Sequence, residues 1–143
     1  MNQKDFTLNL IKIGFCSMAC DGDIHQDEIN ILNNIAQKDF YFSGYKISNE
    51  IEILSSDFKV NGIRFIDTVL NEQVVLDYTE SQKLILIEVA IGIIKADRKI
   101  EKEEIDFVNK LIINLKVPSE FIRLRFGNWD TLDDKGIDSI NLK

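Results

Sequence analysis

The sequence predicts an all-α fold, a compact bundle of about seven helices with an internal pseudo-twofold repeat. Three observations predict it. Apolar residues recur at helical spacing along nearly the whole chain of 143 residues. One proline and seven glycines are too few for a sheet protein with many tight turns. The sequence also contains two copies of one helix–acidic corner–helix pattern.

Charge and hydropathy exclude several classes of protein. The net charge is −7 without a cluster of Lys or Arg, so phosphates and anionic membrane surfaces would be repelled, and nucleic acid is not an expected partner. The longest apolar run, residues 84–94, contains Glu88 and is too short to span a bilayer. Residues 1–10 lack the pattern of a secretory signal. We therefore expect a cytoplasmic protein without direct membrane insertion.

Residues 6–20 form the first predicted helix, with Phe6 and Leu10 close to a 3.6-residue period. Cys16 and Cys20 stand four positions apart on this helix, one above the other. A disulfide between them would be strained, so the sequence predicts two reduced, buried thiols.

The second predicted helix follows a corner at residues 21–24 and ends before Gly44, a plausible breaker. The third begins at Ser48 or Asn49, because Asn49 and Glu52 have the spacing of a capping box.

The middle of the chain contains a turn, a helix and two ambiguous segments. Asn61-Gly62 is a turn signal before a fourth helix. Residues 73–77 are short and briefly extended at most, so they do not predict a sheet. The aromatic segment "FYFSGY", residues 40–45, is interpreted as a lid on the core, with a contact patch as the alternative.

The fifth predicted helix has the clearest start, because Thr79 and Gln82 have capping-box spacing and an apolar run follows at once. This helix is apolar on most sides, and we expect it to be the most buried one. Its polar stripe consists of Ser81, Glu88, Gly92 and Lys95.

The last two predicted helices complete a helical domain at residues 1–126. The sixth covers residues 102–115 and is stopped by Pro118, and the short seventh covers residues 119–126. Residues 127–143 lose periodicity and are interpreted as a loosely ordered acidic tail with one aromatic residue, Trp129.

The repeat is clearest in "CDGDIHQDE" (residues 20–28) and "ADRKIEKEE" (residues 96–104). The alignment pairs Asp21 with Asp97, Ile24 with Ile100 and Glu28 with Glu104. It continues without gaps through the following helices, where apolar residues meet apolar residues. Duplication of one helix–corner–helix unit explains this pattern most simply.

A calcium loop is the first alternative for each corner. With Glu28 as the last ligand, Asp21 and Gly22 match the middle of an EF-hand loop. The first and third ligand positions, however, fall on Ser17 and Ala19, and on a hydrophobe and a cation in the second copy. The sequence therefore favours a helical corner over an EF-hand loop.

As a corner, the pattern predicts local structure. Gly22 adopts a left-handed conformation, and Ile24 and Ile100 enter the core. The acidic pairs Asp27-Glu28 and Glu103-Glu104 lie in exposed first turns, where carboxylates complement the helix dipole.

The acidic residues are still the expected site for a partner or an ion. The candidates are Asp21, Gly22, Asp23, Asp27, Glu28, Asp97, Glu101 and Glu104. If the copies pack symmetrically, their carboxylates converge in one patch that would hold a divalent cation. The best metal candidates are Asp21, Asp23 and Glu28.

Nothing in the sequence predicts catalysis. A zinc site of Cys16, Cys20 and His25 lacks a fourth ligand, and His25 is the only histidine, so no nucleophile with an oriented base is evident. Glu88 is the one carboxylate on the central helix, and its stripe is expected to face a groove or solvent. We expect a protein that is not an enzyme.

The two corners carry a resemblance to a known family. Residues 19–24 with Glu28, and Ala96-Asp97 with Ile100 and Glu104, resemble the TerB-like family of tellurite-resistance and stress proteins, which includes the accessory domain of a membrane-anchored DnaJ-like co-chaperone. The resemblance covers residues 6–126. It implies an all-α bundle with internal pseudo-symmetry, adaptor rather than enzymatic activity, and suspected metal binding.

The second corner departs from the family pattern, because Arg98-Lys99 brings two cations beside Asp97. This leaves the first corner as the better metal candidate.

The sequence and the resemblance together predict a non-enzymatic protein-interaction or accessory module in a cytoplasmic stress-response or defence complex. The alternative is a protein that binds a divalent cation of the Ca²⁺ type through the acidic corners. We expect a protein partner, and a membrane-associated complex and a homodimer both stay open. Beyond that cation, no cofactor is expected. The partner surface is expected on the acidic corners or on the third and fourth helices.

Overall fold

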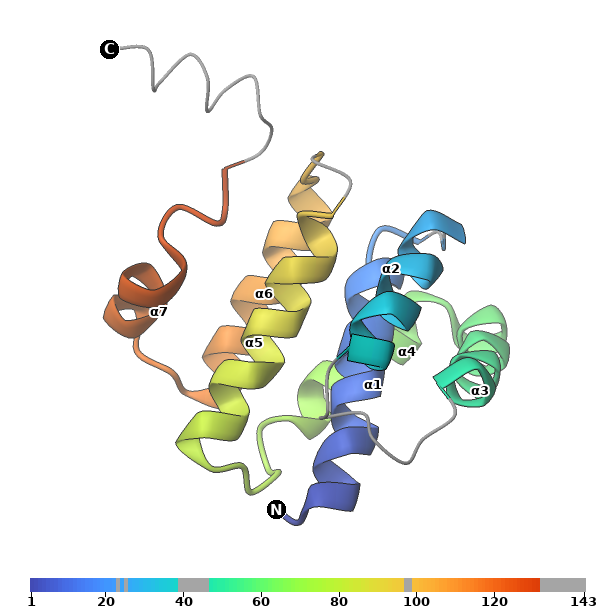
Figure 1. Cartoon of the computed structure of the whole chain (residues 1–143), viewed down its shortest axis with the longest axis horizontal. Helices are drawn as coiled ribbons and strands as arrows, with labels where there is room; N and C mark the ends of the chain where they lie inside the picture. The colour runs from blue at the N-terminus through green and yellow to red at the C-terminus, as the bar shows by residue number, and fades with distance from the viewer. Residues whose placement is uncertain (23, 25, 39–46, 97–98, 132–143) are drawn as a thin grey trace.

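The computed structural model describes residues 1–22, 24, 26–38, 47–96 and 99–131. These residues form seven helices and no strand, which confirms the predicted all-α class (Figure 1). The helices are α1 (Gln3–Ala19), α2 (Gln26–Lys38), α3 (Ile47–Asn61), α4 (Ile63–Glu72), α5 (Glu80–Ile94), α6 (Lys102–Leu115) and α7 (Ser119–Phe126). None of the described helices combines the length and apolarity needed to cross a bilayer.

Helices α1 and α5 lie side by side through the middle of the bundle and run in the same direction (Figure 1). Every residue from 13 to 20 is buried, so α1 needs neighbours on all sides. Helix α5 is also apolar, but 7 of its 15 residues are buried against 11 of the 17 in α1, so the prediction that α5 is the most buried helix is wrong. The four residues of its predicted polar stripe are all exposed, as expected. The other helices cover this central pair.

Gly14 marks the closest approach of α1 to its neighbours. A Cβ atom at this buried position would lie 3.0 Å from Leu32 Cδ1 of α2 and 3.3 Å from Ile93 Cδ1 of α5. Because both distances are shorter than ordinary van der Waals contacts, a larger residue would push the three helices apart.

Aromatic rings attach α3 and α4 to α1. The ring centroid of Phe15 lies 6.1 Å from that of Phe58 and 5.9 Å from that of Phe65, and both pairs pack edge to face. Asn114 Nδ2 of α6 donates to the carbonyl oxygen of Leu70 at 2.8 Å, which ties α6 to the end of α4. These contacts fix α4 and α6 beside the end of α1.

Several helix limits agree with the sequence prediction. The capping box of α5 forms, since Thr79 Oγ1 accepts from the Gln82 amide at 3.1 Å and Gln82 Oε1 accepts from the Thr79 amide at 2.9 Å. The bounds of α6 and α7 are those predicted. The start of α3 at Ile47, however, places Asn49 inside the first turn, so the predicted cap there is wrong.

The segment after α7 is packed beyond the predicted boundary at residue 126. Trp129 is 1% exposed and belongs to the core, so residues 127–131 are not a loose tail. Arg123 holds this segment through hydrogen bonds of 2.9 and 2.8 Å to both carboxylate oxygens of Asp130. The same hydrogen bonds lower the pKa of Asp130 from its ordinary value. The rest of the predicted tail, residues 132–143, lies outside the described residues.

We predict that Trp129→Ala lowers the free energy of unfolding by about 3–5 kcal/mol, because it empties a core position. Leu124→Ala is the control, since Leu124 on α7 is 84% exposed and its loss should change stability by less than about 0.5 kcal/mol. Urea unfolding followed by circular dichroism measures both. Equal, small effects would show that residues 127–131 do not belong to the core.

Candidate functional site

The first acidic corner ends α1 as the sequence predicts. Gly22 has a φ of 95°, a left-handed conformation, and its amide donates to the carbonyl oxygen of Ala19 at 2.9 Å. Ile24 is partly buried and packs against the core. Asp27 and Glu28 follow in the first turn of α2.

The second corner leads into α6 with a matching arrangement. Ile100 is buried, and Glu101 is the N-cap residue of α6. Glu104 Oε1 accepts a hydrogen bond from the Glu101 amide at 2.8 Å, which satisfies a backbone donor at the start of the helix. Glu101 and Glu104 therefore have a structural role at this corner.

The expectation that all first-turn carboxylates are exposed is wrong for one residue in each corner. Glu28 is 6% exposed and Glu104 is 4% exposed, whereas Asp27 and Glu103 are exposed. Each buried glutamate is the third residue of its helix, and the Glu104 carboxylate reaches back to the Glu101 amide. This shared placement is consistent with the predicted repeat, which stays a prediction.

Both corners lie at the same end of the bundle, where α1 and α5 end (Figure 1). The thiol of Cys20, directly after α1, interacts with charges from both corners. Burial raises the pKa of this thiol, and the negative charges of Glu104 and Asp21 raise it further. Cys16 and Cys20 are both free and buried, which confirms that prediction.

The structure brings together only part of the predicted acidic patch. The charges of Asp21 and Glu104 both act on the Cys20 thiol, whereas Asp27 and Glu101 are exposed to solvent. Within the described part of the chain, no three His, Cys, Asp or Glu residues are grouped closely enough to hold a metal ion. The other patch members, Asp23 and Asp97, lie outside the described residues, as does His25. The divalent-cation site stays a prediction.

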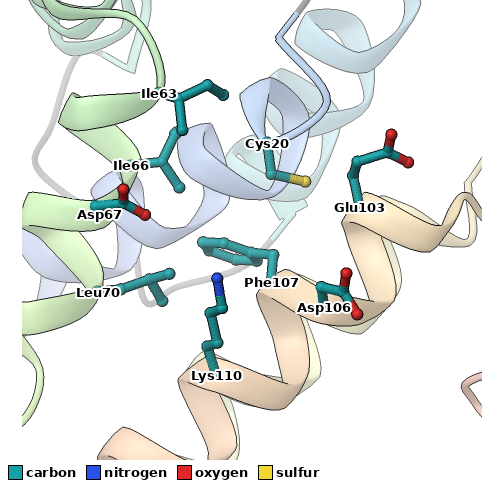
Figure 2. Close-up of a pocket in the computed structure, with 9 residues that line it drawn as sticks. All are labelled: Cys20, Ile63, Ile66, Asp67, Leu70, Glu103, Asp106, Phe107 and Lys110. Carbon is teal, nitrogen blue, oxygen red and sulfur yellow. The ribbon is translucent and has the colours of Figure 1, made fainter.

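A pocket opens beside the two corners, and we call it the corner pocket (Figure 2). It has a volume of about 150 Å³ and lies between the end of α1, helix α4 and the first half of α6. Ile63, Ile66, Leu70 and Phe107 form its apolar part. Its polar part consists of Cys20, Asp67, Glu103, Asp106 and Lys110.

Sequence reasoning missed most of the corner pocket. Its residues on α4 are 63, 66, 67 and 70, and those on α6 are 103, 106, 107 and 110. Each set has i, i+3, i+4, i+7 spacing and therefore marks one helix face. This spacing is visible in the sequence, but only the packing shows that the two faces meet.

Other predicted features have plainer outcomes. Glu88 is exposed and accepts a hydrogen bond from Arg125 Nη2 at 3.2 Å, so it faces solvent as expected. The aromatic segment at residues 40–45 lies outside the described residues.

A second hollow of about 410 Å³ lies between α1, α3 and Leu76, with mainly apolar walls.

Comparisons with protein-family models, curated proteins and solved structures gave no match. The TerB-like resemblance therefore stays a prediction.

We predict that the buried glutamates stabilise the corners and that their exposed neighbours do not. Glu28→Ala and Glu104→Ala should each lower the free energy of unfolding by about 2 kcal/mol. Each substitution removes a buried carboxylate and leaves the group that it interacts with unpaired. Asp27→Ala and Glu103→Ala are the matched controls, one position earlier, and should cost less than about 1 kcal/mol. Urea unfolding measures all four. A cost for the controls as large as that for the glutamates would contradict this role.

Proposed function

We propose that the chain is a non-catalytic protein-interaction module and that its partner docks at the corner pocket. One observation carries this proposal. The pocket joins the two regions where the sequence predicts a partner surface, because Glu103 belongs to an acidic corner and α4 is the predicted fourth helix. Ile63, at the edge of the pocket, leaves 49% of its surface exposed.

The walls of the pocket suit an anchored contact. Interfaces bind most strongly where one side chain of the partner fills a pocket that excludes water. Ile63 offers an exposed apolar surface for such a side chain, and the buried side chains of Ile66 and Phe107 line the pocket beside it. Covering the exposed part of Ile63 would contribute about 1 kcal/mol to binding.

The pocket does not favour nucleophilic catalysis. Cys20 is its only thiol, and the raised pKa keeps that thiol protonated at neutral pH, so it is a poor nucleophile. The pocket carboxylates Asp67, Glu103 and Asp106 are exposed, which favours recognition of a partner over acid–base chemistry.

The proposed setting comes from the resemblance of the corners to the TerB-like family. We place the module in a cytoplasmic stress-response or defence complex, in which it holds a partner protein rather than transforms a substrate.

The test fills the pocket without changing its charge. Ile63→Trp should reduce the capture of a partner by at least about tenfold, because the indole takes the space of the docking side chain. Val75→Trp is the matched control, since Val75 is 81% exposed and lies outside the pocket. The measurement is quantitative affinity capture from cell lysate with each immobilised chain.

The expected result is a set of proteins that wild type and Val75→Trp retain and that Ile63→Trp loses. Equal retention by all three chains would contradict docking at the corner pocket, as would the absence of any enriched protein.

A further inference from the structure

We infer that the corner pocket accepts a lysine or arginine side chain of the partner, and that Lys110 partly fills it in the isolated chain. This inference rests on the proposed function, because it names the chemistry of the group that docks.

The charge of the pocket favours a cation. Its lining has three carboxylates, from Asp67, Glu103 and Asp106, against the one ammonium group of Lys110, which leaves a net charge of −2. The whole chain carries −7, so its long-range field also attracts a basic partner. A carboxylate from a partner would meet repulsion from both.

The carboxylates at the pocket are not neutralised within the protein. In the described part of the chain, no ion pair within 4 Å involves Lys110 or any of the three pocket carboxylates. These groups are hydrated in the isolated chain, and an incoming cation gains their attraction without breaking an existing ion pair.

The apolar residues of the corner pocket suit the methylene stem of a basic side chain. Lysine and arginine bury a long methylene stem while the charged head stays at a polar rim. In the corner pocket, the half-exposed side chain of Ile63 would cover the stem, and the buried side chains of Ile66 and Leu70 line the same pocket. The volume of about 150 Å³ is smaller than that of most small-molecule sites and fits one side chain.

Lys110 is the cationic side chain already at this pocket. It extends from α6 toward the other residues that line the pocket (Figure 2). Lys110 is exposed, so it is free to swing into solvent. A basic side chain from a partner would displace it, and Lys110 therefore competes with the partner.

The first experiment measures the preference of the pocket for charge. The probes are four blocked pentapeptides, Ala-Ala-X-Ala-Ala, in which X is lysine, arginine, norleucine or glutamate. Each is titrated into the ¹⁵N-labelled full chain and followed by amide chemical shifts. We expect the lysine and arginine peptides to shift the amides of residues 63–70 and 103–110, with an affinity at least fivefold above that of the other two. Equal affinities, or a preference for glutamate, would overturn the inference.

The second experiment tests the competition. Lys110→Ala should strengthen binding of the lysine peptide by about two- to fivefold, and Asp106→Asn should weaken it by a similar factor, as expected for exposed charges. The controls Lys59→Ala and Asp77→Asn change the net charge equally on exposed residues outside the pocket and should leave the affinity unchanged. Weaker binding by Lys110→Ala would overturn the inference.

The outcomes separate this inference from the proposed function. Loss of partner capture in Ile63→Trp, without a preference for basic peptides, would overturn the basic side chain alone. A clear preference for basic peptides, with capture that is unaffected by Ile63→Trp, would overturn the proposed function alone.

Discussion

The close contact of α1 with α2 and α5 at Gly14 is the constraint on which the rest of the structure depends. Residues 13–19 of α1 are buried on every side, and α5 is apolar over most of its surface, so neither helix is stable alone. The two must pack together and then be covered. Gly14 lets them approach, since Leu32 and Ile93 fill the space that a Cβ atom would need. The outer helices complete the cover around this pair.

The position of the corner pocket follows from this arrangement. Because α1 and α5 run in the same direction, both acidic corners come to one end of the bundle (Figure 1). The charges of Asp21 and Glu104 both act on the thiol of Cys20. Helices α4 and α6 approach the end of α1 from two sides but do not close over it, which leaves an apolar pocket with an acidic rim.

Local patterns predicted much of the fold and little of the site. The capping box at Thr79 and the stop at Pro118 act within a few residues, so α5 and α6 were predictable. Trp129 looked like part of a tail because its burial depends on the folded bundle, which no local pattern reveals. The first-turn positions of Glu28 and Glu104 follow from the sequence, but their burial depends on tertiary packing. The corner pocket needs two helix faces from distant parts of the sequence.

The most direct test of this account is the stability of Gly14→Val beside that of Gly92→Ala, measured by urea unfolding. Gly92 is exposed on α5, and a Cβ atom there meets nothing within 4 Å. Gly14→Val should lower the free energy of unfolding by about 1–3 kcal/mol, because the added methyl groups overpack the contact. Gly92→Ala should raise it by about 0.5–1 kcal/mol, because alanine favours the helix. An unchanged or higher stability of Gly14→Val would contradict a close contact of the three helices at Gly14.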